Sequence, residues 1–316
     1  MSDSFYTLAD LTKINDNNLA DIDVSDLFNK APLLAQVAAT VASNGTVHKY
    51  VKETTAPTVG FREVNTGREN SKSGDTLVTV TLKYLDASVS IDKAICDGYK
   101  GGPSAILARE AVRHLRQGFF EAESQFLNGT GNEADGFNGL ADSLNATSLD
   151  FVIDAGGSAA GGSGDTLLTS IYLVRSTGDL SDVAVVTGND GMIDMSEAFL
   201  TTIDDDDNGG RFTAWHMPIA SWLGMQVGSA KSVARIANID NGSNKVTDDL
   251  IYSAIKEFDS AMQPTHIVMN RRSAEQLRAS RTATNATGAP APYATEVNGV
   301  PVVVVDSLNN NESEVS

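Results

Sequence analysis

The segment from residue 60 to residue 93 constrains the fold most, because it reads as extended chain far longer than an ordinary strand. Val78, Val80 and Leu82 alternate with polar residues, and this period of two predicts a strand. The apolar positions change parity after Tyr84, which predicts a bulge or bend there. About fifteen residues at ~3.3 Å each span about 50 Å, whereas strands usually hold five or six residues. We therefore interpret residues 60–93 as a long hairpin with a charged tip at residues 67–75 and very little core of its own.

A long amphipathic helix is predicted after the hairpin, over residues 103–128. Apolar residues recur at spacings of three and four from Ala108 to Phe126, which places them on one side of a helix about 37 Å long. Pro103 near its start and Gly129 after its end are typical helix boundaries. The opposite side carries charged residues: Arg109, Glu110, Arg113, Arg116, Glu121 and Glu123. We interpret this helix as a structural beam.

The rest of the chain reads as a polar arm followed by an α/β region. The arm covers residues 1–50 and holds a predicted helix at residues 27–45, which Gly45 ends. Strands are predicted at residues 182–190, 224–239, 265–270 and 299–307. Helices are predicted from Thr247, as N-cap, and from a capping box at Ser273–Gln276. This mixture of elements predicts an α+β fold.

Composition excludes several classes of protein. The chain has 23 Lys and Arg against 41 Asp and Glu, a net charge of -18, which argues against a surface built to grip nucleic acid. The single cysteine, Cys96, allows no disulfide within the chain, and we expect it to be a small buried residue. We expect no signal peptide, and no apolar run approaches the ~18 residues of a membrane span, so no membrane partner is predicted.

The sequence motifs that suggest chemistry are all incomplete. Gly156–Ser163 resembles a phosphate loop, but Gly162 stands where lysine is required, so a flexible surface loop is predicted. Asp204–Gly209 copies the first half of a calcium loop, but Trp215 occupies the position of the bidentate glutamate. An acidic turn is expected there, and calcium binding stays open. The four histidines form no zinc motif and no serine nucleophile elbow exists. We predict no catalytic residue, no cofactor and no metal site.

The order of these parts resembles a known family. An arm and an extended hairpin precede an isolated long helix that ends in "FLNGTGNEADGFNGL". An α/β region follows, with "VAVVTGNDG", "THIVMNRRSAEQLRASRTATNATGAPAP" and a last strand in "VNGVPVVVVDS". This arrangement is similar to that of tailed-bacteriophage major capsid proteins of the Hong Kong 97 fold.

The resemblance implies a division of the whole chain. Residues 1–50 would form the N-terminal arm and residues 60–93 the extended loop. Residues 51–59 and 94–153 would form the peripheral domain, with the spine helix at 103–128. Residues 154–306 would form the axial domain with a late return segment to the peripheral domain, and residues 307–316 a C-terminal tail.

The resemblance also implies function and partners. The chain would assemble in the host cytoplasm, as pentamers and hexamers, into an icosahedral shell that encloses phage double-stranded DNA without specific sequence binding, and it would be found in the virion. A scaffolding protein, a portal and a decoration protein are the implied partners. Lys72 lies near the loop tip, but no pattern identifies a cross-linking acceptor. Two alternatives remain open: an encapsulin-like nanocompartment shell, and a soluble α/β enzyme with an extended hairpin arm.

The apolar residues of the hairpin would be poorly packed in a single chain. In the shell, a neighbouring subunit would cover them. The tip charges would meet opposite charges there. Arg271 and Arg272, followed by Arg278 and Arg281, form either a helix face with local salt bridges or a contact to an acidic neighbour. The predicted contacts between subunits are Arg62, Glu63, Arg68, Glu69, Lys72, Asp75, Val78, Val80, Leu82, Arg271 and Arg272.

Overall fold

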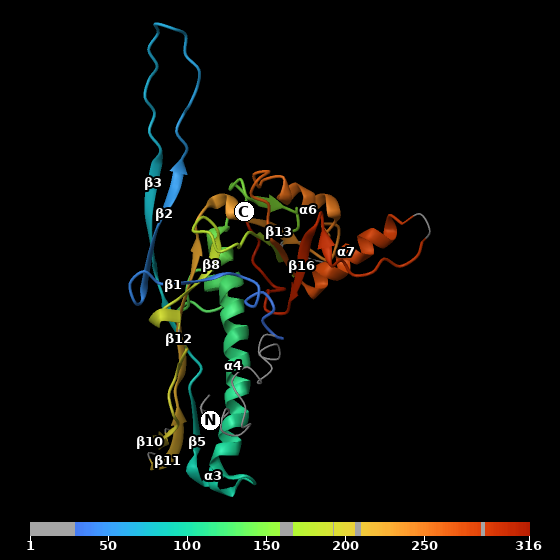
Figure 1. The fold of residues 1–316 in the computed structure, drawn as a ribbon. Coiled ribbons are helices and arrows are strands. Elements are labelled where there is room, and N and C mark those ends of the chain that lie inside the picture. Colours follow the sequence, from blue (N-terminus) through green and yellow to red (C-terminus); the bar gives the residue numbers. More distant parts are fainter. Residues whose placement is uncertain (1–28, 159–166, 192, 206–209, 286–287) are drawn as a thin grey trace.

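The fold is arranged along one long helix, α4 (Gly102–Asn128), as the computed structural model shows (Figure 1). The structure describes residues 29–158, 167–191, 193–205, 210–285 and 288–316. Helix α4 confirms the predicted helix and begins one residue earlier than expected. Gly129 caps its end with φ 58°, and a Cβ there would lie 1.8 Å from Asp142 Oδ2, so only glycine fits.

The two halves of α4 are buried differently. Its first half buries one side, whereas every residue from Ala122 to Asn128 is buried, including polar ones. These polar groups have partners within the chain, as buried polar groups require. Gln125 Nε2 donates to Phe137 O at 2.7 Å, and Asn128 Nδ2 donates to Ser307 O at 2.8 Å.

A six-stranded sheet packs beside the C-terminal half of α4 and holds most of the core. Its order is β15 (Glu296–Val297), β16 (Val300–Val305), β14 (His266–Asn270), β7 (Thr169–Val174), β13 (Val233–Ile239) and β6 (Val152–Asp154). Strands β7 and β13 are buried along their whole length, with separate hydrophobic clusters on the two faces of the sheet. Helices α6 (Asp248–Ile255) and α7 (Arg271–Ala283) contribute to one of these clusters.

The starts of helices α6 and α7 were both predicted from their capping residues. Thr247 Oγ1 accepts the N–H of Leu250, which confirms the predicted start of α6. The predicted capping box at Ser273–Gln276 is wrong, because Asn270 Oδ1 accepts the N–H of Ser273 and caps α7 three residues earlier. The side chain of Gln276 instead accepts a hydrogen bond from a distant backbone N–H, that of Val246.

Two further sheets lie on the α4 side of the molecule. One has the order β1 (Ala39–Val41), β8 (Val183–Thr187), β12 (Ile219–Val227), β4 (Lys83–Asp86), with β9 (Asp194–Met195) also on β12. The other has the order β10 (Phe199–Asp205), β11 (Gly210–Met217), β5 (Val89–Asp92). The strands within residues 183–227 thus pair with strands outside the six-stranded sheet. The predicted axial domain had grouped these residues with that sheet. Among the described residues the short helices are α3 (Lys93–Gly98), α5 (Leu140–Ser143), η2 (Gly129–Gly131), η3 (Asn189–Gly191) and η4 (Ala230–Ser232). Cys96 on α3 is buried as predicted, and burial raises the pKa of its thiol.

The predicted hairpin exists but begins earlier. Strands β2 (Val47–Thr55) and β3 (Gly74–Thr81) form a two-stranded antiparallel ribbon that projects from the body (Figure 1). The predicted first arm after residue 60 is wrong, because residues 56–73 form the loop that joins the strands. The predicted second arm consists of three strands, β3, β4 and β5, and each belongs to a different sheet. The chain breaks at Leu82 and at residues 87–88, so the predicted single bend at Tyr84 is wrong.

Both chain ends of the described region are tied to the body by side chains. The predicted helix at residues 27–45 is wrong for residues 29–45, which form turns and β1. Pro32 disfavours a helix at this position. The N–H groups of Leu33 and Leu34 donate to Glu123 Oε2 at 2.8 and 3.2 Å instead of to carbonyl groups of a helix. The predicted C-terminal tail, residues 307–316, packs on the body: the Glu312 carboxylate lies 2.7 Å from Arg235 Nη2.

Candidate assembly interface

The β2–β3 hairpin has one face that packs on its own chain. Strand pairing puts His48 opposite Val80 and Tyr50 opposite Val78. His48 Nε2 lies 2.8 Å from Gln226 Oε1, and the Tyr50 hydroxyl donates to the carbonyl of Val227 at 3.1 Å. Burial raises the pKa of Tyr50. This inner face therefore rests on the end of β12.

Leu82, the residue directly after β3, is almost fully buried. Its side chain is 1% exposed in the single chain, and a Cβ on Gly224 of β12 would lie only 2.5 Å from Leu82 Cδ2. The prediction that Leu82 is poorly packed is therefore wrong, because a glycine on β12 lets the leucine reach the core. Val78 and Val80 are half-buried on the same face. Their role between subunits stays a prediction.

The outer face of the hairpin carries an exposed apolar pair among polar residues. Val51 and Leu77 are cross-strand partners and are 64% and 62% exposed. In the connecting loop, Val59, Phe61 and Val64 are almost fully exposed. These residues were not among the contacts predicted from the sequence. Leu77 directly precedes Val78 in the strand, so its side chain must point to the opposite face.

The loop at residues 56–73 is held in shape by its own arginines. Arg68 donates through Nη2 to Thr58 O at 2.5 Å and through Nη1 to Gly60 O at 3.0 Å, and Arg62 Nη1 donates to Thr66 O at 3.0 Å. Thr66 N–H also donates to Glu63 O, which closes a turn. Arg62 and Arg68, which were predicted to contact a neighbour, therefore bind carbonyl groups of their own loop. The other charged residues predicted to contact a neighbour are exposed: Glu63, Glu69, Lys72 and Asp75.

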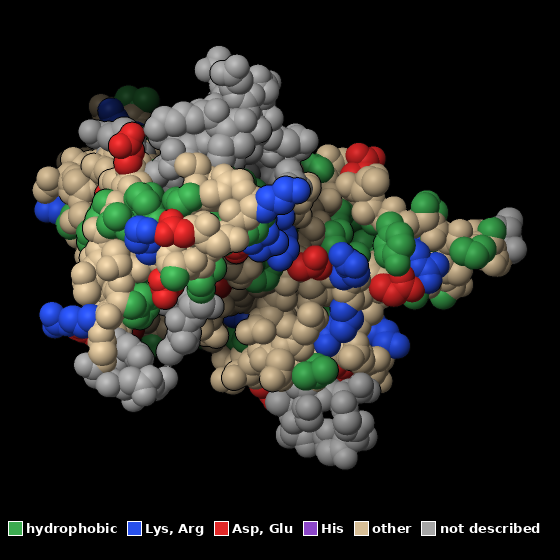
Figure 2. All heavy atoms as spheres, turned by 90° about the horizontal axis from the view of Figure 1, so that it is seen from below, with side chains coloured by type: hydrophobic (Ala, Val, Ile, Leu, Met, Phe, Trp, Pro, Cys, Tyr) green, Lys and Arg blue, Asp and Glu red, His purple; other side chains and the backbone are tan. Residues whose placement is uncertain are grey.

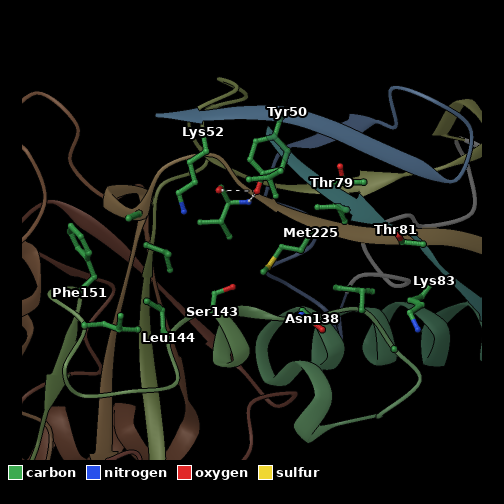
Figure 3. Close-up of a pocket in the computed structure, with 18 of the residues that line it drawn as sticks. Tyr50, Lys52, Thr79, Thr81, Lys83, Asn138, Ser143, Leu144, Phe151 and Met225 are labelled. Carbon is green, nitrogen blue, oxygen red and sulfur yellow. Dashed lines mark hydrogen bonds between the residues drawn. The ribbon is translucent and has the colours of Figure 1, made fainter. Parts of the chain in front are cut away.

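A groove of about 730 Å³ lies at the base of the hairpin. Tyr50 and Lys52 enter it from the hairpin, Met225 from β12, and Leu144 from just after α5 (Figure 3). Its lining mixes apolar side chains with lysine and hydroxyl groups. No group of three or more His, Cys, Asp or Glu side chains that could hold a metal occurs among the described residues.

The arginines of α7 have partners within the chain. Arg271 Nη2 lies 3.5 Å from Asp306 Oδ2, and Arg272 Nη2 donates to Ile239 O at 3.3 Å. Arg278 pairs with Glu275 and Arg281 with Asp248, each at 2.6 Å. The salt-bridged helix face foreseen as one alternative is present. A contact to a neighbour stays a prediction.

The remaining predicted features lie partly outside the described residues. Residues 206–209 of the calcium-like turn and residues 159–163 of the glycine-rich stretch are in this class. Within the calcium-like turn, Asp204 Oδ1 lies 2.5 Å from Arg211 Nε, so this carboxylate pairs with a cation of its own hairpin. Within the described parts of the chain, no helix is long and apolar enough to cross a membrane.

Comparison with known proteins decides the family. Residues 16–316 match the family described as major capsid protein GP7. The chain belongs to this major capsid protein family. The GP7-family chain is therefore a structural protein of the phage head shell, located in the virion, and not an enzyme. The alternatives of a nanocompartment shell and of a soluble enzyme are not retained.

Solved capsid structures are similar to this GP7-family chain. The cryo-EM structure of bacteriophage Epsilon15 matches with a TM-score of 0.64 and 20% identity, over 89% of this chain and 88% of that one. The bacteriophage JBD30 capsid matches with a TM-score of 0.49 and 12% identity, over 97% of this chain and 100% of that one. No curated protein matches the sequence. The Epsilon15 likeness confirms the predicted α+β fold of the Hong Kong 97 type.

Proposed function

We propose that each capsid subunit holds its neighbour through the outer face of the β2–β3 hairpin and the loop at residues 56–73. The single observation that carries this proposal is the set of exposed apolar side chains there, headed by Phe61, on a ribbon that projects from the body (Figure 1). Contiguous exposed apolar surface marks interaction sites in folded proteins. A shell of identical copies supplies the partner, a second subunit.

The contact would be modest in one copy and strong in a closed shell. Burying a side chain of the size of phenylalanine or leucine contributes about 1.5–3 kcal/mol. Such a contact is heterologous, and it closes into rings of five and six subunits when the curvature fits. Each subunit both gives and receives the hairpin, so many weak contacts act together.

Charged residues would set the register of this contact. Glu63, Glu69, Lys72 and Asp75 are exposed near the apolar residues of the loop, and a neighbour with complementary charges would align the contact. Arg62 and Arg68 would act indirectly, by holding the loop in shape. Arg271 and Arg272, at the start of α7, remain candidates for a second contact.

The remaining partners follow from the family and from the net charge of -18. The shell would enclose double-stranded DNA by volume instead of by a specific grip, because an acidic subunit repels phosphates. Scaffolding, portal and decoration proteins would assist assembly in the host cytoplasm. We also propose the division into arm, extended loop, peripheral domain and axial domain, with residues 183–227 moved to the α4 side.

The test replaces one exposed apolar residue of the loop at residues 56–73 and compares it with an exposed apolar residue elsewhere. Phe61→Ser is expected to leave the subunit folded and to abolish or weaken shells in negative-stain images and in sedimentation. Leu180→Ser is the control, because Leu180 is 70% exposed but lies outside the hairpin. Deletion of residues 67–75 is expected to act like Phe61→Ser. Normal particles from Phe61→Ser, with unchanged resistance to urea, would refute the role of the loop.

A further inference from the structure

The groove at the base of the β2–β3 hairpin runs along one edge of β3. Strands β2 and β3 form a two-stranded sheet, so among the described residues β3 has no strand partner on its second side. Four consecutive β3 residues, 78–81, line the groove. Side chains of consecutive strand residues point to opposite faces. A surface that touches all four residues therefore follows the edge of β3, where backbone N–H and C=O groups are free to pair.

The rest of the groove supplies an apolar floor and two lysines. Lys52, Met225 and Ser143 point into it from β2, β12 and α5 (Figure 3). Lys52 and Lys83 are the basic residues among the described lining, and Asp150 is the acidic one. The apolar lining includes Phe137, Leu144, Leu149, Phe151, Met225 and Val227. A strand edge beside apolar pockets is the kind of site that binds an extended peptide by strand addition.

The loop at residues 56–73 offers a segment of matching form. Residues 56–61 run as extended chain on the projecting ribbon (Figure 1). Arg68 binds the carbonyl groups of Thr58 and Gly60, so these two groups face the interior of the loop. Val59 and Phe61 have no backbone hydrogen bond to any described residue, and the alternation of an extended chain turns their backbone groups outward. Their side chains are almost fully exposed.

This segment does not reach the groove of its own chain. Tyr50 lines the groove, and Phe61 lies eleven residues further along an extended ribbon, about 36 Å away at ~3.3 Å per residue. The ribbon projects from the body, and folding it back would break the β2–β3 pairing (Figure 1). Twice the radius of gyration of a 316-residue chain is about 40 Å, so the ribbon spans the distance to an adjacent copy.

We propose that residues 56–61 of one subunit bind the groove of a second copy by strand addition to β3. The proposal names the acceptor of the hairpin contact and rests on that proposed function. Val59 and Phe61 pack on the apolar floor, and Glu63 lies near the lysines of the groove. Each subunit has one such segment and one such groove. The contact is therefore heterologous and repeats from subunit to subunit around a ring.

The test joins the segment to the groove by a disulfide between two subunits. Val59→Cys and Ser143→Cys are placed in separate chains, which are mixed, assembled into shells and oxidised. The natural Cys96 is buried and does not compete. Linked dimers on a non-reducing gel are expected at roughly tenfold or more above the control, since docking gives the two thiols a high effective concentration. The control uses Ser253→Cys on α6, because Ser143 and Ser253 both donate to the carbonyl four residues earlier.

A second variant tests the groove without cysteines. Leu149→Glu places a charge in the lining at a side chain that is 40% exposed, so the subunit is expected to fold. Docking would bury that charge against apolar side chains, and the yield of shells is expected to fall to roughly a tenth of the wild type. Leu167→Glu is the control, because Leu167 is 41% exposed and does not line the groove.

Two results would overturn the groove as acceptor. The thiol at position 59 could link no better to position 143 than to position 253 in shells that form. Leu149→Glu could also assemble as well as Leu167→Glu. If Phe61→Ser still abolishes shells in either case, the hairpin contact stands and only its acceptor is wrong. A disulfide between positions 59 and 143, with normal shells from Phe61→Ser, would confirm the groove and refute the role of the loop in holding the shell together.

Discussion

Glu123 is the residue whose replacement tests the packing of the capsid subunit most sharply. Its carboxylate is fully buried on α4 and joins three segments. Oε2 accepts the N–H groups of Leu33 and Leu34, and Oε1 accepts the Ser307 hydroxyl at 2.5 Å. Glu123→Ala leaves two backbone donors without an acceptor in a buried site, and each such group costs about 1–3 kcal/mol. We expect a total loss of about 2–5 kcal/mol, since water can enter part of the gap.

Glu123→Gln is the matched control for that change. The amide carbonyl can still accept both backbone N–H groups, and the amide nitrogen can donate to the Ser307 hydroxyl. Its stability is therefore expected to lie within ~1 kcal/mol of the wild type. Urea unfolding of unassembled subunits gives the free energy. Hydrogen exchange of the Leu33 and Leu34 amides gives the local effect. The reasoning is refuted if Gln destabilises as much as Ala, or if Ala leaves both measurements unchanged.

The pH dependence of Glu123 adds a second measurement. Burial raises its pKa above the ordinary value, although the hydrogen bonds from Ser307, Leu33 and Leu34 lower it. The folded chain then holds this proton more tightly than the unfolded chain does. The stability that protonated Glu123 contributes is complete below the unfolded pKa of ~4.3 and is lost as pH rises through the folded pKa. Glu123→Gln has no such titration, so it is expected to gain stability relative to the wild type across that interval.

Two further substitutions test the core that anchors the hairpin and the C-terminal residues. Leu82→Ala is expected to destabilise the subunit by about 2–5 kcal/mol in urea unfolding, because it empties a fully buried site. A loss below ~1 kcal/mol would mean that Leu82 is packed only in the shell, as the sequence predicted. Glu312→Ala leaves Arg235, whose side chain is 4% exposed, without its carboxylate, and is expected to cost about 3–5 kcal/mol by thermal unfolding. An unchanged melting temperature would show that the C-terminal residues do not hold the sheet.

Local patterns in the sequence were enough to predict the long helix and several of the strands. The apolar spacing from Ala108 to Phe126 and the glycine at 129 specify α4 through contacts within a few turns. The strand at residues 265–270 was predicted from a short apolar run, and β14 lies there. The order of these elements was also enough to suggest the capsid family, which the match over residues 16–316 confirms.

Only the tertiary structure decided which side chains of the hairpin are covered and what the charges do. Leu82 is buried because Gly224, more than a hundred residues later, leaves space for it. Arg62 and Arg68 bind carbonyl groups of their own loop, and Glu123 sets the path of residues 33–34. Periodicity and capping are local interactions that a sequence displays directly. Burial and hydrogen-bond partners depend on segments far apart along the chain, and these meet only after folding.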